Sequence, residues 1–202
     1  MAHDDEALMA ARMRALAALA PAYFHDLRGP LNTIVLRVGV LHAIGGDADD
    51  PARTGSLAAI ESEVRRLDGL LTAWLRHTAP ASAGTELAVL LRQCVALAAP
   101  AARERRGGIE LVERLEPVAV CSNPLAVGTA VLQLLRHAVA RMHDGGAVIR
   151  VAATRQEAQA ELTIAGVAWD ADVAAETSQL LLGIRGSCGV SPGGDMIVRL
   201  PL

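Results

Sequence analysis

The sequence predicts an α+β protein with a helical hairpin in its N-terminal part and an α/β sandwich in its C-terminal part. Two long runs of apolar residues at helical spacing precede residue 79, and shorter helical and strand-like segments alternate after residue 85. The chain has 202 residues and 52% hydrophobic content, which is enough for two small cores. We therefore expect a hairpin domain over residues 1–79, a linker over 80–85 and a sandwich domain over 86–202.

Two long helices with apolar seams form the predicted hairpin. The first runs from about Asp4 to Ile44, and the second begins at Asp50–Pro51, with Asp50 as N-cap and Pro51 as first helical residue. The seams, in steps of three and four, are Phe24, Leu27, Leu31, Ile34, Val38 and Leu41, then Leu57, Ile60, Val64, Leu67, Leu71 and Trp74. Two helices alone bury such seams poorly, so we expect a homodimer whose hairpins form a four-helix bundle.

The C-terminal part alternates between helical and strand-like segments. The predicted helices lie near Glu86–Ala99, Pro124–Met142 and Ala171–Leu182, the second capped by Ser122 or Asn123. The predicted strands lie near Ile109–Arg114, Val148–Thr154, Ala160–Val167, Gly183–Val190 and Met196–Leu200. This order of helices and antiparallel strands predicts a two-layer sandwich.

Composition argues against several kinds of partner. The net charge is only -3 and the charges are mixed along the chain, so we expect no nucleic-acid binding. Polar residues interrupt the apolar stretches well before the roughly 20 residues of a membrane span, so we expect neither a membrane segment nor a signal peptide. Cys94, Cys121 and Cys188 lack metal-ligand spacing, which predicts buried thiols in a reducing cytoplasm and no metal site.

The most informative motif is His25-Asp26-Leu27-Arg28-Gly29-Pro30-Leu31-Asn32, inside the first predicted helix. It places a titratable nucleophile, an adjacent acid and a proline on one amphipathic helix. It resembles the phosphoacceptor box of two-component histidine kinases, which reads His, Glu or Asp, an apolar residue, Arg or Lys, a variable residue, Pro and Leu. Most helical histidines have no chemistry, but a His-Asp pair followed by a proline within a helix has few structural reasons to exist.

His25 lies off the apolar seam, on a helix face that it shares with Arg28, Gly29, Asn32 and Leu36. We expect this face to point to solvent and to bind a partner protein. Leu36 is either ordinary surface or a docking contact, and the sequence leaves both open.

The C-terminal part resembles the catalytic, ATP-binding domain of the histidine kinases, down to its closing residues 193–201. The family's nucleotide ligands are missing. Gln133 and His137 stand at the two asparagine positions, and Ala165 stands where an aspartate reads the adenine. Asp170 is displaced by several residues, and too few residues lie between Leu182 and the last strand pair for an ATP lid.

A histidine box, a dimerising hairpin and a nucleotide domain without nucleotide ligands together resemble the dimeric, ChpT-like histidine phosphotransferases. The resemblance implies that His25 is the phosphoacceptor, that Asp26 orients its ring, and that Arg28, Gly29, Asn32 and Leu36 contact receiver domains of response regulators. It also implies that no cofactor is needed, because Mg²⁺ belongs to the partner's receiver domain. Gly29 replaces the family's Thr or Asn, so we expect weak phosphatase activity.

Two other functions remain open on the sequence. The chain would be a divergent but active cytoplasmic histidine kinase if it bound ATP. It would be a noncatalytic adaptor that sequesters a response regulator if it bound a phosphorylated receiver without accepting its phosphoryl group on His25.

Overall fold

The computed structural model of the chain describes residues 2–44, 50–78, 84–115, 119, 121, 123–142 and 147–201. The helices are α1 (Ala2–Ala43), α2 (Pro51–Thr78), α3 (Leu87–Glu104), α4 (Pro124–Arg141) and α5 (Ala171–Leu181), followed by a 3₁₀ turn (Leu182–Ile184). The strands are β1 (Gly108–Arg114), β2 (Val148–Gln156), β3 (Gln159–Ala165), β4 (Ser187–Val190) and β5 (Met196–Pro201). The predicted α+β class is confirmed. The turn after α1 and most of the predicted linker lie outside the described residues.

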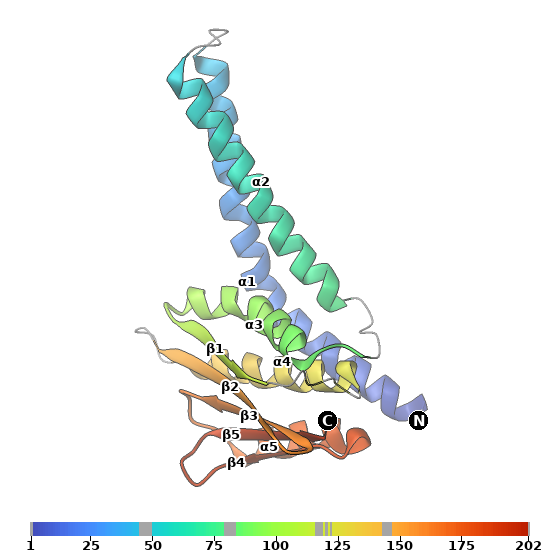
Figure 1. Ribbon diagram of the computed structural model, residues 1–202. Coiled ribbons are helices and arrows are strands. Elements are labelled where there is room, and N and C mark those ends of the chain that lie inside the picture. Colours follow the sequence, from blue (N-terminus) through green and yellow to red (C-terminus); the bar gives the residue numbers. More distant parts are fainter. Residues whose placement is uncertain are drawn as a thin grey trace.

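α1 and α2 form the predicted hairpin, which projects from the rest of the molecule (Figure 1). α2 begins as the sequence predicts: Pro51 is its first residue, and the Asp50 carboxylate accepts a hydrogen bond from the Ala52 amide at 2.7 Å. Near its base the hairpin is closed by Tyr23, whose hydroxyl donates to the Leu70 carbonyl and whose ring lies 4.9 Å from that of Trp74. The two helices are thus fixed to each other two residues before His25.

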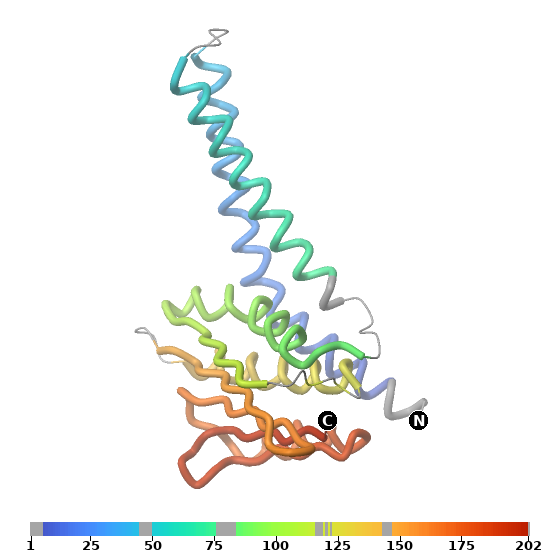
Figure 2. Tube along the Cα trace, in the orientation of Figure 1, coloured from blue at the N-terminus to red at the C-terminus, as the bar shows by residue number. Residues whose placement is uncertain are grey.

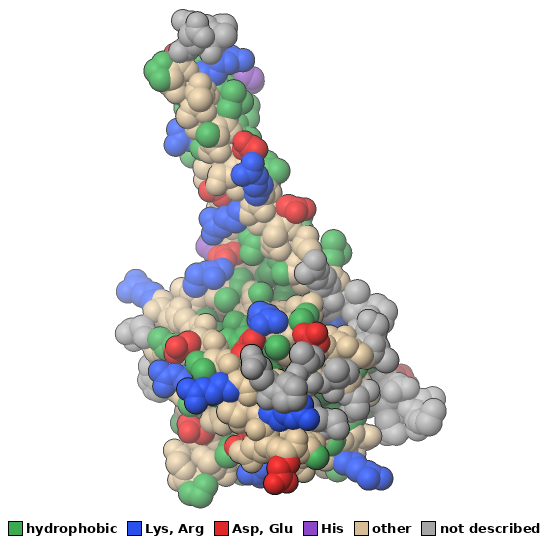
Figure 3. Space-filling view, in the orientation of Figure 1, with side chains coloured by type: hydrophobic (Ala, Val, Ile, Leu, Met, Phe, Trp, Pro, Cys, Tyr) green, Lys and Arg blue, Asp and Glu red, His purple; other side chains and the backbone are tan. Residues whose placement is uncertain are grey.

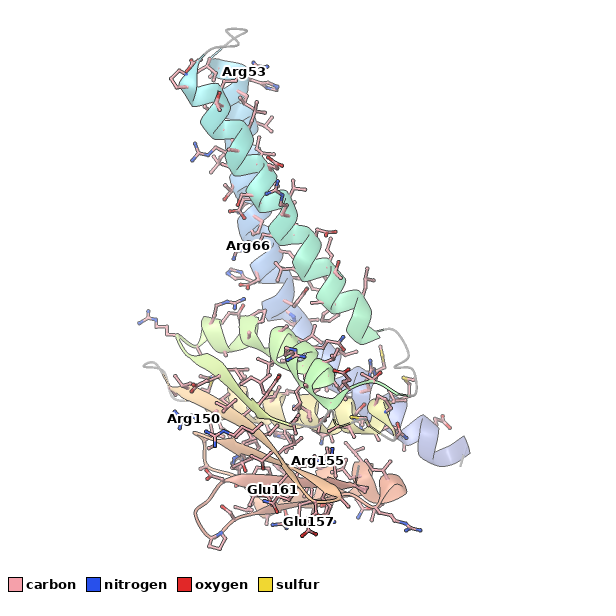
Figure 4. The ribbon with its side chains drawn as sticks, viewed as in Figure 1. Arg53, Arg66, Arg150, Arg155, Glu157 and Glu161 are labelled. Carbon is pink, nitrogen blue, oxygen red and sulfur yellow. The ribbon has the colours of Figure 1, made fainter. Side chains whose placement is uncertain are left out.

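The sheet is mixed, with strand order β1-β2-β3-β5-β4. The expectation of antiparallel strands is correct for three of the pairings, but β1 and β2 are parallel, with Gly108 opposite Val148. α4 lies between these two strands in the chain, and such a crossover returns the second strand in the direction of the first. One sheet face is buried, and the other carries two cross-strand ion pairs, Arg150 with Glu110 and Arg199 with Glu161, each at 3.1 Å. Arg150 and Glu161, one member of each pair, are labelled on the sheet in Figure 4.

Helices α3, α4 and α5 contribute side chains to the core, which lies against the buried face of the sheet. Asn123 caps α4, as predicted, by accepting a hydrogen bond from the Ala126 amide at 3.0 Å. α3 continues past Pro100, where the sequence predicted its end, for one more turn to Glu104. The proline and the two alanines after it are buried, and this packing compensates for the lost helix hydrogen bond.

The first half of α1 belongs to the same core as the sheet. Its buried side chains there are Ala15, Leu16, Leu19, Ala22 and Tyr23. These residues pack on α3 and α4, and α1 then changes direction where it leaves the α/β part (Figure 2). Pro21 and Pro30 lie within α1, and each removes one helix hydrogen bond, which accounts for the bend. α1 is therefore shared between the two predicted domains.

The hairpin buries only half of each predicted seam. Leu27, Ile34 and Leu41 of α1 and Ile60, Leu67 and Trp74 of α2 are partly buried. A second stripe stays exposed along each helix, formed by Phe24, Leu31, Val35 and Val38 on α1 and by Leu57, Val64, Leu71 and Leu75 on α2. Figure 3 shows hydrophobic side chains of this kind among the charged ones of the hairpin. Such stripes are what a second hairpin would cover in a four-helix bundle.

We predict that this exposed stripe makes the protein a homodimer. Leu71 is 47% exposed in the single chain, and Leu71→Asp would bury an unpaired charge in the dimer, at a cost of several kcal/mol. Sedimentation at micromolar concentration should give a dimer for the wild type and a monomer for Leu71→Asp. Leu67→Asp, at a position partly buried on α2, should destabilise the hairpin as well.

The control is Leu182→Asp, an exposed leucine outside the hairpin, which should remain dimeric. A wild-type chain that sediments as a monomer would contradict the prediction.

Candidate functional site

His25 lies exposed on α1, just beyond the point where the helix leaves the core of the α/β part. Ala22 and Tyr23, three and two residues before it, are buried, whereas the His25 side chain is exposed. Within the described chain the His25 ring has no hydrogen-bond partner. An exposed, unengaged imidazole near neutral pH can act as a nucleophile toward a group that a partner protein presents.

The predicted partner face is exposed throughout. Arg28, Gly29, Asn32 and Leu36 all reach solvent, and Leu36 is 71% exposed. A methyl group added at Gly29 would meet no atom within 4 Å, so packing does not require a glycine there. Gly29 lies one turn beyond His25, where residues four apart are neighbours on the surface. The missing side chain leaves open space beside the imidazole.

Asp26 faces the α/β part and not the His25 ring. Its carboxylate accepts a hydrogen bond from the Arg103 guanidinium, on the last turn of α3. The described residues contain no hydrogen bond between Asp26 and His25, so the ring-orienting role of Asp26 stays a prediction. Sequence reasoning missed Arg103, because 77 residues separate the partners and no local pattern marks the pair.

Tyr23, Phe24 and Trp74 form an aromatic cluster at the base of the hairpin. The Phe24 and Trp74 rings lie 6.1 Å apart, and the Tyr23 ring packs on Trp74 from the buried side. Burial raises the pKa of the Tyr23 phenol, so this group stays a neutral hydrogen-bond donor at physiological pH. The cluster uses nearly all of the aromatic side chains of a chain that has only 2% aromatic residues, and it supports the turn that carries His25.

One of the positions expected for a nucleotide ligand, Gln133, is covered by α1. Gln133 is only 4% exposed, and its Nε2 atom has no partner among the described residues. Ala11 and Ala15 of α1 lie over it, leaving a cavity of about 90 Å³, well below the several hundred Å³ of a typical ligand pocket. His137 is half-buried, and its Nε2 atom lies 2.8 Å from the Arg136 guanidinium. Burial is the main cause that lowers the pKa of this imidazole, and the positive charge of Arg136 lowers it further.

The segment at the expected adenine position is occupied by its own contacts. Gly166 has a φ of +100°, and a side chain there would come within 2.3 Å of the Val148 carbonyl. The Trp169 indole donates to the Ile164 carbonyl at 3.0 Å. Asp170 is paired with Arg141, which lowers the pKa of the Asp170 carboxyl group. The Asp170 carboxylate, the displaced acid of this segment, is thus already engaged by a guanidinium.

The described stretch between α5 and β4 is too short for a lid, because the 3₁₀ turn that follows α5 leads within a few residues into β4. A larger groove of about 560 Å³ lies between the start of α4 and the end of α5. Its lining side chains are mostly Ala, Leu and Ile, and Asn123 and Gln179 are the polar ones. None of the described lining residues carries a charge that would hold a phosphate group. The described residues also contain no cluster of potential metal ligands and no helix that is long and apolar enough to cross a membrane.

Comparison with known proteins identifies the fold. No family profile and no curated protein matches the chain. Among solved structures, full-length ShkA in complex with AMPPNP has a TM-score of 0.50 at 19% identity, over 91% of this chain and 45% of that one. The fold is histidine-kinase-like. Two further solved structures are similar to the chain. The histidine kinase AdeS of Acinetobacter baumannii has a TM-score of 0.48 at 13% identity, over 88% of this chain and 97% of that one. A bacterial phosphotransferase has a TM-score of 0.46 at 13% identity, over 93% of this chain and 95% of that one.

At this level of identity the match to ShkA establishes the fold alone. The chain spans less than half of ShkA. The expected histidine-kinase-like architecture is confirmed, while the activity has to be argued from the site.

We predict that millimolar Mg-ATP does not bind the protein. The expected ligand positions carry the wrong residues, and α1 covers one of them. Titration calorimetry should give no saturable heat for the wild type. It should also give none for Gln133→Asn, which restores the family's ligand but leaves α1 in place. Saturable binding to either protein would contradict the prediction.

Proposed function

We propose that the protein is a histidine phosphotransferase of the dimeric, ChpT-like type in a two-component phosphorelay. His25 would accept a phosphoryl group from the aspartyl phosphate of one receiver domain and pass it to the aspartate of another, without ATP. One observation carries the proposal: an exposed histidine stands in a phosphoacceptor box, in the same chain in which α1 covers the Gln133 position of the expected nucleotide site.

The chemistry is a reversible phosphoryl transfer. The lone pair of a neutral His25 ring nitrogen attacks phosphorus, an N–P bond forms, the P–O bond to the aspartate breaks, and a carboxylate leaves. The same steps in reverse pass the group to the second receiver. Charge on the transferred group is balanced mainly by Mg²⁺ held in the receiver, so this chain needs no cofactor of its own. Arg28, one turn from His25, would offset part of the remaining charge.

The closed nucleotide position argues against the kinase alternative. A kinase must bring a nucleotide to its own histidine, and a nucleotide at Gln133 would have to displace α1 from the core. The exposed ring and the free space at Gly29 favour chemistry at His25 over simple sequestration of a partner. In this proposal the partners are response-regulator receiver domains and a second copy of the chain in the cytoplasm, with neither nucleic acid nor membrane involved.

The function predicts that His25 alone accepts the phosphoryl group. Incubation with radiolabelled, phosphorylated receivers of the host should label the wild type, and His25→Gln should abolish the label. His42→Gln, at another exposed histidine of α1, is the matched control and should be labelled at the wild-type rate. Binding of a phosphorylated receiver without any labelling of the wild type would instead support the adaptor alternative.

The exposed face beside His25 predicts where the receiver docks. Leu36→Asp would remove an apolar contact and desolvate a charge, which we expect to cost about 1–3 kcal/mol, or about tenfold to a hundredfold in affinity. Arg28→Glu should slow association, because it reverses a charge next to the acidic pocket of the receiver.

Both variants should remain folded dimers, since neither side chain is buried. Val190→Asp, at an exposed apolar position on β4, is the control for a surface charge. Transfer to Leu36→Asp at the wild-type rate under subsaturating receiver would show that docking uses a different face.

A further inference from the structure

The ion pair between Asp26 and Arg103 joins the residue directly after His25 to the α/β part of the molecule. Arg103 lies on the last turn of α3, and its guanidinium donates to the Asp26 Oδ2 atom. The Asp26 side chain is 17% exposed and that of Arg103 is 53% exposed. The pair therefore lies at the rim of the junction between α1 and α3, where a docking partner can reach both elements.

The position of Asp26 on α1 suits it to hold α3. Consecutive residues of a helix do not face each other, and the structure places His25 in solvent while Asp26 turns toward α3. A carboxylate bound to a guanidinium is held by a charge-assisted hydrogen bond that fixes its direction. The contact thus ties the end of α3 to the turn that carries His25.

The end of α3 is a basic surface. Arg105 and Arg106 follow Arg103, and both are exposed. Arg106 adopts a left-handed backbone conformation, with a φ of 57°, as the chain turns toward β1. Whatever holds the end of α3 in place also holds these positive charges at a fixed position beside the phosphoacceptor helix.

We propose that Asp26 and Arg103 are positioning residues: their ion pair fixes the last turn of α3 beside His25, so that a receiver domain docked on His25 meets a second, basic contact on the α/β part. This inference rests on the proposed phosphotransfer function. Loss of either partner would loosen the second contact and weaken receiver docking. Removal of the Arg103 guanidinium would leave the exposed imidazole itself unchanged.

A double-mutant cycle tests the proposal. Transfer from the receiver that labels the wild type fastest is measured against receiver concentration for Asp26→Ala, Arg103→Ala and the double variant. Each single change should raise the receiver concentration for half-maximal transfer about two- to fivefold, as expected for an exposed ion pair. The double variant should be no worse than the single ones, because all three lose the same contact.

Two controls separate docking from chemistry. Arg92→Ala breaks a comparable pair on α3, with Glu113 at 2.5 Å, and should leave transfer unchanged. Phosphoramidate is a small donor that needs no docking surface: its P–N bond breaks, the ring N–P bond forms, and ammonia leaves with the proton that the ring gives up. Arg103→Ala should be labelled by phosphoramidate at the wild-type rate, and Arg103→Lys should recover part of the receiver affinity.

Specific outcomes would overturn the proposal. Effects of Asp26→Ala and Arg103→Ala that add in the double variant would show that the two residues act separately. If transfer to Arg103→Ala depended on receiver concentration as it does for the wild type, Arg103 would have no positioning role. Phosphotransfer at His25 would not be contradicted by that result. A wild type that phosphoramidate labels but no receiver labels would contradict the phosphorelay function itself, and the inferred receiver contact with it.

Discussion

The burial of the first half of α1 is the constraint on which the rest of the molecule depends. Ala15, Leu19 and Tyr23 lie in one core with α3, α4 and the sheet, while the second half of the same helix packs along α2. Because the helix is continuous, the packing of its first half fixes the direction in which the hairpin leaves the α/β part. The position of His25 is thus decided by apolar side chains within the three turns before it.

Four consecutive residues of α1 lie in four different environments. Phe24 belongs to the exposed apolar stripe, His25 points to solvent, Asp26 pairs with α3, and Leu27 packs against the core. Steps of about 100° around the helix separate these directions. A single turn can therefore serve self-association, partner binding and attachment to the α/β part without any residue serving two of them. This separation allows each contact to be changed without loss of the others.

Local chemistry made much of the fold predictable from the sequence. The cap at Asp50 and the exposure of His25 were predicted correctly, and the cap of α4 is Asn123, one of the two candidates that the sequence offered, because each is set by residues nearby in the chain. The parallel β1–β2 pair, the Arg103 partner and the cover over Gln133 were not predicted. Periodicity tells which face of an element is apolar, but it does not tell which distant element will cover that face.

The packing that places His25 also closes the cleft beside α4. Ala11 and Ala15 carry only methyl groups, so α1 can lie close over Gln133. A nucleotide there would have to expose Leu16 and Leu19 again, at about 1.5–3 kcal/mol for each side chain. Placing His25 and admitting a nucleotide at Gln133 are thus alternative uses of the same helix surface. The core of the chain realises the first use, which is the only one that the proposed relay function would need.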